Sequence, residues 1–182
     1  MANVQQFALL QRVLHWFMAL CILTMFFVGV GMVSSVTPRY LGLVEFHKSL
    51  GILLLILVAI RLAARWRYGA PALPATLPEP LKLAAVSSHY LLYGLMIVLP
   101  LLGWAMLSAG PYPVVVFGSL RLPPILPQSE FLHTVLWDAH HYLAFAFFAL
   151  VLAHLAAALM HALIRRDGVF EAMAPYPTRE GN

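Results

Sequence analysis

Charged residues are scarce in this chain of 182 residues. Lysine, arginine, aspartate and glutamate together make up 10% of it, whereas 62% of the residues are hydrophobic. Soluble globular domains are about a quarter charged, so this composition excludes an ordinary soluble domain and predicts an integral membrane protein. Cysteine is rarer still: Cys21, in an apolar run, is the single cysteine of the sequence. An internal disulfide is therefore excluded.

Four apolar segments are long enough to cross a bilayer, which takes about 20 apolar residues. We predict spans at about Val13–Val33, Glu45–Ala64, Val86–Ser108 and Asp138–Leu163. The predicted fold is therefore all-α, a four-helix transmembrane bundle that forms one membrane-embedded domain over residues 1–182. No small-residue cleavage site follows the first span, so we interpret it as a retained helix rather than a signal peptide.

Two proline-rich stretches connect the spans. Tyr68–Pro80 is predicted to be an extended connector between spans two and three. Gly110–Pro127 is predicted to be a structured loop between spans three and four, and its apolar Val114–Phe117 is too short to cross the membrane. We therefore expect Val114–Phe117 to lie at the membrane interface.

Basic residues are divided unequally between the two sides of the predicted bundle. Eight belong to the N-terminus, the loop between spans two and three, and the C-terminus: Arg12, Arg61, Arg65, Arg67, Lys82, Arg165, Arg166 and Arg179. The other two loops carry Arg39, Lys48 and Arg121. Cytoplasmic loops are rich in Lys and Arg, so both termini are predicted to be cytoplasmic. The net charge of +4 is thus explained by topology anchors and does not indicate nucleic-acid binding.

Every predicted span carries a histidine near one end, and these histidines fall into two layers. His47 and His140 belong to the outer layer, and the inner layer holds His15, His89, His154 and His161. Ionisable residues inside a membrane are costly and mark functional sites. A metal cofactor held between helices would explain several facing histidines, and haem fits best.

Helical spacing favours a particular set of ligands. His140 and His154 are fourteen residues apart, which places them on nearly one helix face and about 21 Å apart along the axis. His141 falls off that face. Because low-spin haem b takes two axial imidazoles, we predict two haems, with His47 and His140 as the outer pair and His15 and His154 as the inner pair. His89 or His161 remains an alternative partner in the inner layer.

Simpler roles are expected for two further histidines. We expect an ordinary surface role for His133, which is predicted to lie in the outer loop, and a local hydrogen bond or a haem-edge contact for His141. A non-haem metal site is disfavoured because the layers contain few carboxylates. Covalent c-type attachment is excluded, because the sequence contains no C-x-x-C-H.

The chain resembles the bacterial cytochrome b561 family of di-haem b membrane proteins over nearly its full length. The motifs are Leu14–Trp16, His47–Gly51 followed by Arg61-Leu62 and Arg65, Ser88–Tyr90 followed by Leu99-Pro100, and His140 through His154 and His161 to Arg166-Asp167-Gly168. The fold is also similar to the membrane cytochrome subunits of nickel-iron hydrogenase and formate dehydrogenase. Their ligands come from spans one, two and four, which supports the pairing above and implies another role for His89 and His161.

The resemblance implies electron transfer between a periplasmic reductant and quinone in the bacterial inner membrane. One family type is a superoxide oxidase, in which superoxide is oxidised outside and ubiquinone is reduced inside. Arg39, Lys48 and Arg121 would attract the anion, although Glu45 offsets part of their field and a cation at position 48 departs from the family pattern. His89, His161 and Ser88 would face the quinone, because imidazole can deliver protons near neutral pH.

Other interpretations remain open at this stage. The chain is alternatively a membrane anchor that passes electrons from a periplasmic dehydrogenase or hydrogenase to quinone, with the partner docked on Gly110–Pro127. A transporter would need polar residues along its spans, which offer almost none beyond histidine. Arg61 and Arg65 would bind haem propionates or lipid phosphates, with plain topology anchoring slightly favoured.

Overall fold

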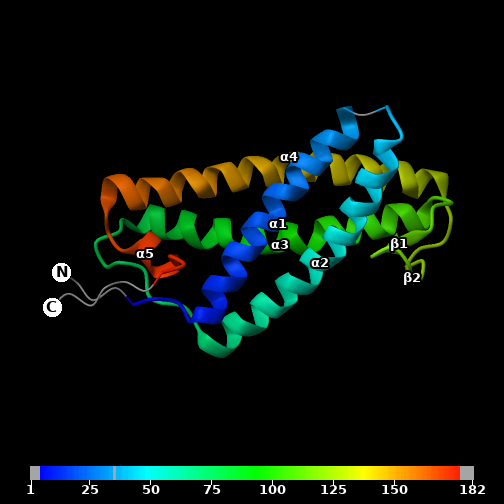
Figure 1. Cartoon of the computed structure of the whole chain (residues 1–182). Coiled ribbons are helices and arrows are strands. Elements are labelled where there is room, and N and C mark those ends of the chain that lie inside the picture. Colours follow the sequence, from blue (N-terminus) through cyan, green and yellow to red (C-terminus); the bar gives the residue numbers. More distant parts are fainter. Residues whose placement is uncertain (1–4, 35, 177–182) are drawn as a thin grey trace.

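The computed structural model describes residues 5–34 and 36–176, most of which are helical (Figure 1). The long helices are α1 (Leu9–Ser34), α2 (Arg39–Tyr68), α3 (Glu79–Ala109) and α4 (Glu130–Leu159). The shorter elements are β1 (Val114–Val116), β2 (Leu120–Leu122), the π-helical turn η1 (Met160–Arg165) and α5 (Val169–Met173). Within the described residues, four helices are long and apolar enough to cross a membrane, with η1 extending the last one to Arg165. The four-helix transmembrane prediction is therefore confirmed.

Local residue chemistry sets the ends of these helices. A proline precedes both α2 and α3, and Gly69 ends α2 with a positive φ of 70° that favours glycine. The helix α4 begins at Glu130 and not at Asp138 as predicted, because the Ser129 hydroxyl accepts a hydrogen bond from the Leu132 amide and caps a longer helix. His133 consequently lies in α4 and not in a loop.

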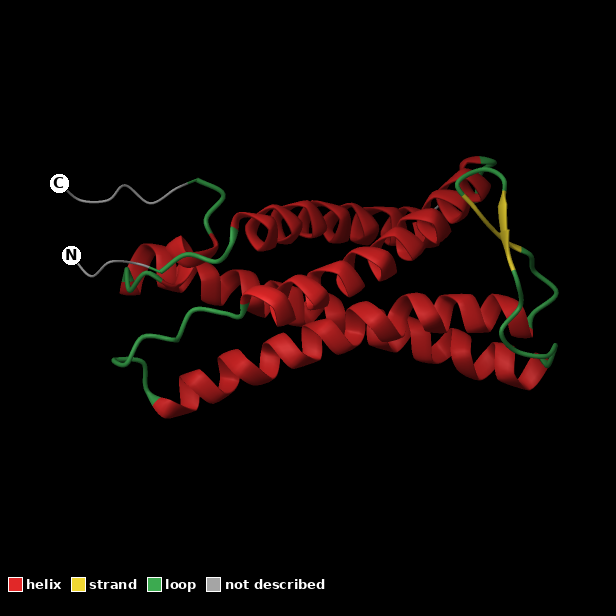
Figure 2. Ribbon diagram, turned by 90° about the horizontal axis from the view of Figure 1, so that it is seen from below, coloured by secondary structure: helices red, strands yellow, loops and turns green. Residues whose placement is uncertain are grey.

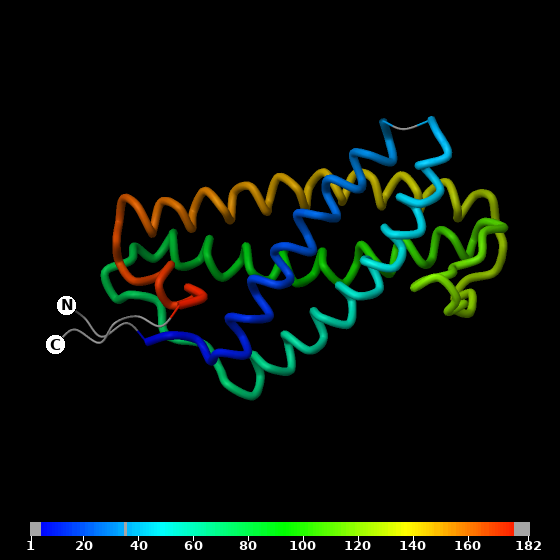
Figure 3. Tube along the Cα trace, viewed as in Figure 1, coloured from blue at the N-terminus to red at the C-terminus, as the bar shows by residue number. Residues whose placement is uncertain are grey.

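The long helices form two antiparallel hairpins. In Figures 1 and 3, α1 runs beside α2 and α3 runs beside α4, and the first hairpin crosses the second obliquely. The buried core lies between α1 and α2, where Leu14, Met18 and Cys21 meet Leu54 and Val58. α3 contributes Tyr93, Met96 and Ile97 at the edge of this core. The first hairpin is thus tightly packed on itself, and α2 links it to α3.

A β-hairpin closes the end of the bundle that is remote from the described termini (Figure 2). Val114–Val116 pairs antiparallel with Leu120–Leu122, so the predicted structured loop contains two short strands. The Phe117 amide donates to the Ser49 hydroxyl on α2 at 2.8 Å, and the Trp104 indole on α3 donates to the Pro123 carbonyl at 2.9 Å. The loop is therefore tied to both helical hairpins.

The opposite end joins the beginning and the end of the described chain. The Phe7 amide donates to the Ala172 carbonyl at 3.0 Å, and the Trp16 indole donates to the Met173 carbonyl at 2.9 Å. Arg12 is buried and donates to the Ala174 carbonyl at 3.1 Å. Both described ends thus lie on one side of the bundle, as the topology prediction requires. That this side is cytoplasmic stays a prediction.

Candidate functional site

Two histidines from different hairpins face each other toward the end of the bundle that carries the β-hairpin, which is the predicted outer end. The ring centres of His47 on α2 and His140 on α4 are 6.1 Å apart, and the ring planes are inclined by 66°. The His140 Nδ1–H donates to the Leu99 carbonyl of α3 at 3.1 Å, which leaves Nε2 free to bind a metal. Gly103 lies against the His140 ring, since a Cβ built there would be 3.5 Å from its Cε1. The predicted outer pair is therefore brought together.

A second group of histidines meets toward the end that holds the described termini, which is the predicted inner end. The ring centres of His15 on α1 and His154 on α4 are 6.2 Å apart, with the planes inclined by 78°. His89 on α3 is also close to His154, at 5.4 Å between ring centres. Its Nδ1–H donates to the Ala85 carbonyl one turn earlier in its own helix. The geometry thus retains His89 as the alternative inner partner.

Both pairs fit an iron porphyrin held between two imidazoles. Metal–imidazole bonds are about 2 Å long, so two imidazoles that held one iron between them would have ring centres about 6 Å apart. The His140 bond to Leu99 is of the kind that orients metal-bound imidazoles. The buried Nδ1 of His47 has no partner among the described residues, so the protein alone leaves this ring unsatisfied.

The histidines form no cluster that could hold a bare metal ion among the described residues. In residues 5–34 and 36–176, no group of three or more His, Cys, Asp or Glu side chains is placed to hold a single metal ion. Two imidazoles at each end suit a macrocycle that supplies the other iron ligands itself. Phe147, midway between His140 and His154 in the sequence, is buried and packs on Phe26, with ring centres 5.7 Å apart.

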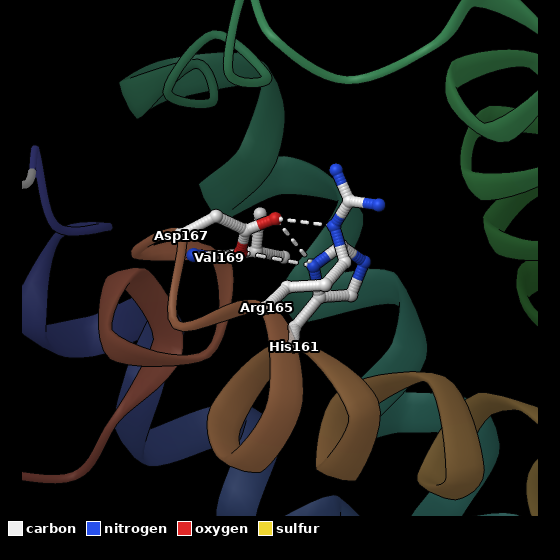
Figure 4. A network of polar contacts seen from close by, with 4 residues as sticks. All are labelled: His161, Arg165, Asp167 and Val169. Atoms are coloured by element: carbon white, nitrogen blue, oxygen red, sulfur yellow. Dashed lines mark hydrogen bonds and ion pairs between the residues drawn. The ribbon is translucent and has the colours of Figure 1, made fainter.

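His161 lies in the π-helical turn η1 that follows α4, and it forms a polar cluster there (Figure 4). Its Nδ1–H donates to both oxygens of Asp167 at 2.9 Å, and the Arg165 Nε–H donates to the same carboxylate at 3.0 Å. The π-helical turn η1 and the left-handed Arg166, at φ 50°, bend the chain so that Asp167 returns to His161. The other ring nitrogen of His161 points away from Asp167.

The Asp167 carboxylate is stabilised in its charged form. Partial burial opposes its ionisation, but hydrogen bonds from Arg165, His161 and the Val169 amide outweigh burial and hold the pKa of Asp167 below its ordinary value of 3.8. Sequence reasoning quoted Asp167 only as part of a motif. Two residues six apart do not meet in a regular helix, so the sequence did not indicate that Asp167 contacts His161. The contact forms because the π-helical turn η1 and the left-handed Arg166 bend the chain back.

We expect this cluster to stabilise the inner end at every pH above about 4. A depressed pKa contributes stability that is complete above the unfolded-state pKa and is lost as the pH falls through the folded value. Protection of the α5 amides, measured by hydrogen exchange and corrected for intrinsic rates, should be constant from about pH 8 to pH 5 and should fall below about pH 4. In Asp167→Asn the protection should be lower than in the wild type above about pH 5 and should show no change through this titration. An unchanged wild-type profile down to pH 3 would contradict the assignment.

The remaining predicted site residues are spread over both ends. Arg39 and Arg121 are exposed at the outer end, and Lys48 is partly buried next to His47. The Ser88 hydroxyl donates to the Ala85 carbonyl of its own helix at 2.9 Å. The Nδ1–H of His141 donates to the Trp137 carbonyl at 2.9 Å, as predicted for a local hydrogen bond. His133 is partly buried and donates to the Met106 carbonyl at 2.7 Å, so it joins α4 to α3 instead of lying on the surface as predicted.

Comparison with known proteins decides the family. The sequence profile of the prokaryotic cytochrome b561 family matches residues 6–176. The chain belongs to this family. Cytochrome b561 homolog 2 of Escherichia coli strain K12 is 30% identical over 174 residues, which cover 93% of this chain and 91% of that protein. Cytochrome b561 homolog 1 of the same strain is 28% identical over 180 residues, covering 94% and 98% respectively.

A third relative has a more specific name. The probable superoxide oxidase CybB of Yersinia pestis is 32% identical over 131 residues, which cover 71% of this chain and 73% of that protein. Membership of the cytochrome b561 family makes the chain a haem b-binding electron-transfer protein of the bacterial inner membrane, with the four spans that the helices provide. The predicted family, fold class and location are thus confirmed.

Proposed function

We propose that this cytochrome b561 family member binds two b haems and oxidises superoxide at its outer end while reducing ubiquinone at its inner end. The observation that carries the proposal is the pair of facing imidazoles at each end, His47 with His140 and His15 with His154, at ring-centre distances of 6.1 and 6.2 Å. The relative named as a probable superoxide oxidase supports the choice of substrate.

The reaction is balanced over two superoxide anions. Each loses one electron and leaves as dioxygen, and one ubiquinone takes up the two electrons and two protons to become ubiquinol. When bound, haem b supplies one-electron redox chemistry at each end. His47, His140, His15 and His154 would hold the irons, and the Leu99 carbonyl orients His140.

The outer cations would guide the anion to the site. Arg39, Lys48 and Arg121 form no ion pair among the described residues. Glu45, Glu130 and Asp138 lie at the same end of the bundle, so the net charge there is close to zero and the effect depends on where each charge lies. Lys48 directly follows His47 and is therefore the cation that we expect to matter most.

The inner residues would supply the protons. His161 is held by Asp167 in the tautomer that carries its hydrogen on Nδ1, and its other ring nitrogen is left free for a quinone oxygen or a water molecule. The bond of the His89 Nδ1–H to Ala85 likewise leaves Nε2 of His89 available. Ser88 adds a hydroxyl on the adjacent position of α3.

Purified protein mixed with superoxide and a short-chain ubiquinone should consume superoxide catalytically and form ubiquinol in a ratio of about two to one. We expect Lys48→Gln to lower the second-order rate constant several-fold at low salt and to weaken its dependence on ionic strength. The matched control is Arg67→Gln, which removes an exposed cation from the other end of the same helix and should leave the rate unchanged.

Two results would contradict the proposal. The absence of quinone-dependent superoxide consumption in protein that retains its haem would remove the enzyme assignment. Co-purification of a stoichiometric periplasmic dehydrogenase or hydrogenase from native membranes, together with that inactivity, would establish the anchor function instead.

A further inference from the structure

Arg61, in the half of α2 that lies nearer the described termini, is a partly buried cation that forms no ion pair within the described residues. Its Nε–H donates to the Tyr93 hydroxyl of α3 at 3.0 Å, and the guanidinium carbon lies 5.9 Å from the centre of the same ring. The Nη1 atom is buried and has no hydrogen-bond partner in the described part of the chain. Leaving a buried donor of a charged group unpaired is costly, and no described residue provides the partner.

Two of the carboxylates at this end of the bundle are engaged by other residues. At the inner end, Asp167 bonds to His161 and Arg165, and Glu79 bonds to Lys82. Glu171 forms no ion pair with Arg61 or with any other described residue, although its Oε2 atom is buried without a hydrogen-bond partner. Arg61 is therefore held by Tyr93, and its buried Nη1 has no partner among the described residues.

The buried Nη1 atom of Arg61 lies near the inner histidine site. Tyr93, which holds Arg61, lies about one helical turn after His89 on α3, and the ring centres of His89 and His154 are 5.4 Å apart. The guanidinium therefore lies near the predicted inner pair, close enough to act electrostatically on His15 and His154. Arg65 lies one turn closer to the helix end and is exposed, as expected of a topology anchor. Because Nη1 of Arg61 is buried, a lipid phosphate at the membrane surface is a poor partner for it.

We propose that Arg61, positioned by Tyr93, binds a propionate carboxylate of the inner haem through Nη1. This inference depends on the inner haem of the proposed function. Haem b carries two carboxylates, and guanidinium groups bind carboxylates in a planar, charge-assisted arrangement. A positive charge at this position also favours the reduced form of the iron, since reduction removes one positive charge from the centre. Arg61 would thereby raise the reduction potential of the inner haem above the value it has without the cation.

The proposal is tested by spectroelectrochemical titration of the purified holoprotein, with bound haem quantified per chain. We expect Arg61→Gln to retain both haems and to lower the midpoint potential of one of them by about 59 mV, equivalent to about a tenfold change in its reduction equilibrium. The other haem should be unaffected. Tyr93→Phe keeps the charge but frees the guanidinium, so it should produce a smaller shift of the same haem in the same direction.

Arg65→Gln is the matched control, because it removes the same charge from the same helix at an exposed position. Equal shifts of the midpoint potential in Arg61→Gln and Arg65→Gln would overturn the proposal. So would unchanged midpoint potentials in both Arg61→Gln and Tyr93→Phe when both haems are present. Unchanged potentials with a raised KM for ubiquinone would overturn it in favour of a quinone contact. If Arg61→Gln does not fold, Arg61→Lys and Tyr93→Phe decide the question by the same measurement. Wild-type protein with only one haem would instead refute the proposed di-haem function.

Discussion

His140→Ala should lose the outer haem and keep the inner one. His140 is the only one of the two adjacent histidines on α4 whose ring faces His47, at 6.1 Å between ring centres, and its Nδ1–H is already fixed by the Leu99 carbonyl. Removing one axial imidazole leaves the iron without its second ligand. Haem extracted per chain should fall from about two to about one, and the reduced-minus-oxidised spectrum should lose one of its two components.

His141→Ala is the matched control for this experiment. His141 is the next residue on the same helix, but its ring is bonded to the Trp137 carbonyl of its own helix at 2.9 Å. The variant should therefore retain both haems and both spectral components. Loss of the outer haem from His141→Ala but not from His140→Ala would show that the helical phase of the site is wrong.

His15→Ala should lose the inner haem, whereas His89→Ala should keep it. His89 lies closer to His154 than His15 does, with ring centres 5.4 Å and 6.2 Å apart. However, His89 and His154 belong to α3 and α4, which pack directly on each other in one hairpin. His15 lies in the other hairpin, so a macrocycle between His15 and His154 would occupy the same kind of position as the one between His47 and His140.

The measurement separates the two roles of the inner histidines. Haem content and the absorption spectrum show whether a histidine holds the inner haem. The rate of ubiquinol formation shows whether it acts on the quinone. We expect His15→Ala to lose one haem together with nearly all quinone reduction. His89→Ala should keep both haems and reduce quinone more slowly, as expected for a residue that donates a proton. If His89→Ala loses the inner haem and His15→Ala does not, the inner ligands are His89 and His154.

The two histidine layers could be predicted from the sequence, but the contacts that position each histidine could not. Depth in the membrane follows from hydropathy and helical rise, both local properties, so His47 and His140 were predicted at one level before any contact was known. The start of α4 at Glu130 was missed because the Ser129 cap lies outside the apolar run. The β-hairpin was missed as well, because its strands are only three residues long.

Composition and helical periodicity by themselves determined four apolar spans, a common side for the two ends, and one face of α4 that carries His140 and His154. These features depend on residues within a few turns of each other. The tertiary structure alone decided that both facing pairs join different hairpins, that Asp167 returns to His161, and that Arg61 is held by Tyr93 with a buried nitrogen left unpaired. Such contacts depend on how the two hairpins cross and how the π-helical turn bends the chain, and the spacing of residues along a single helix carries no information about either.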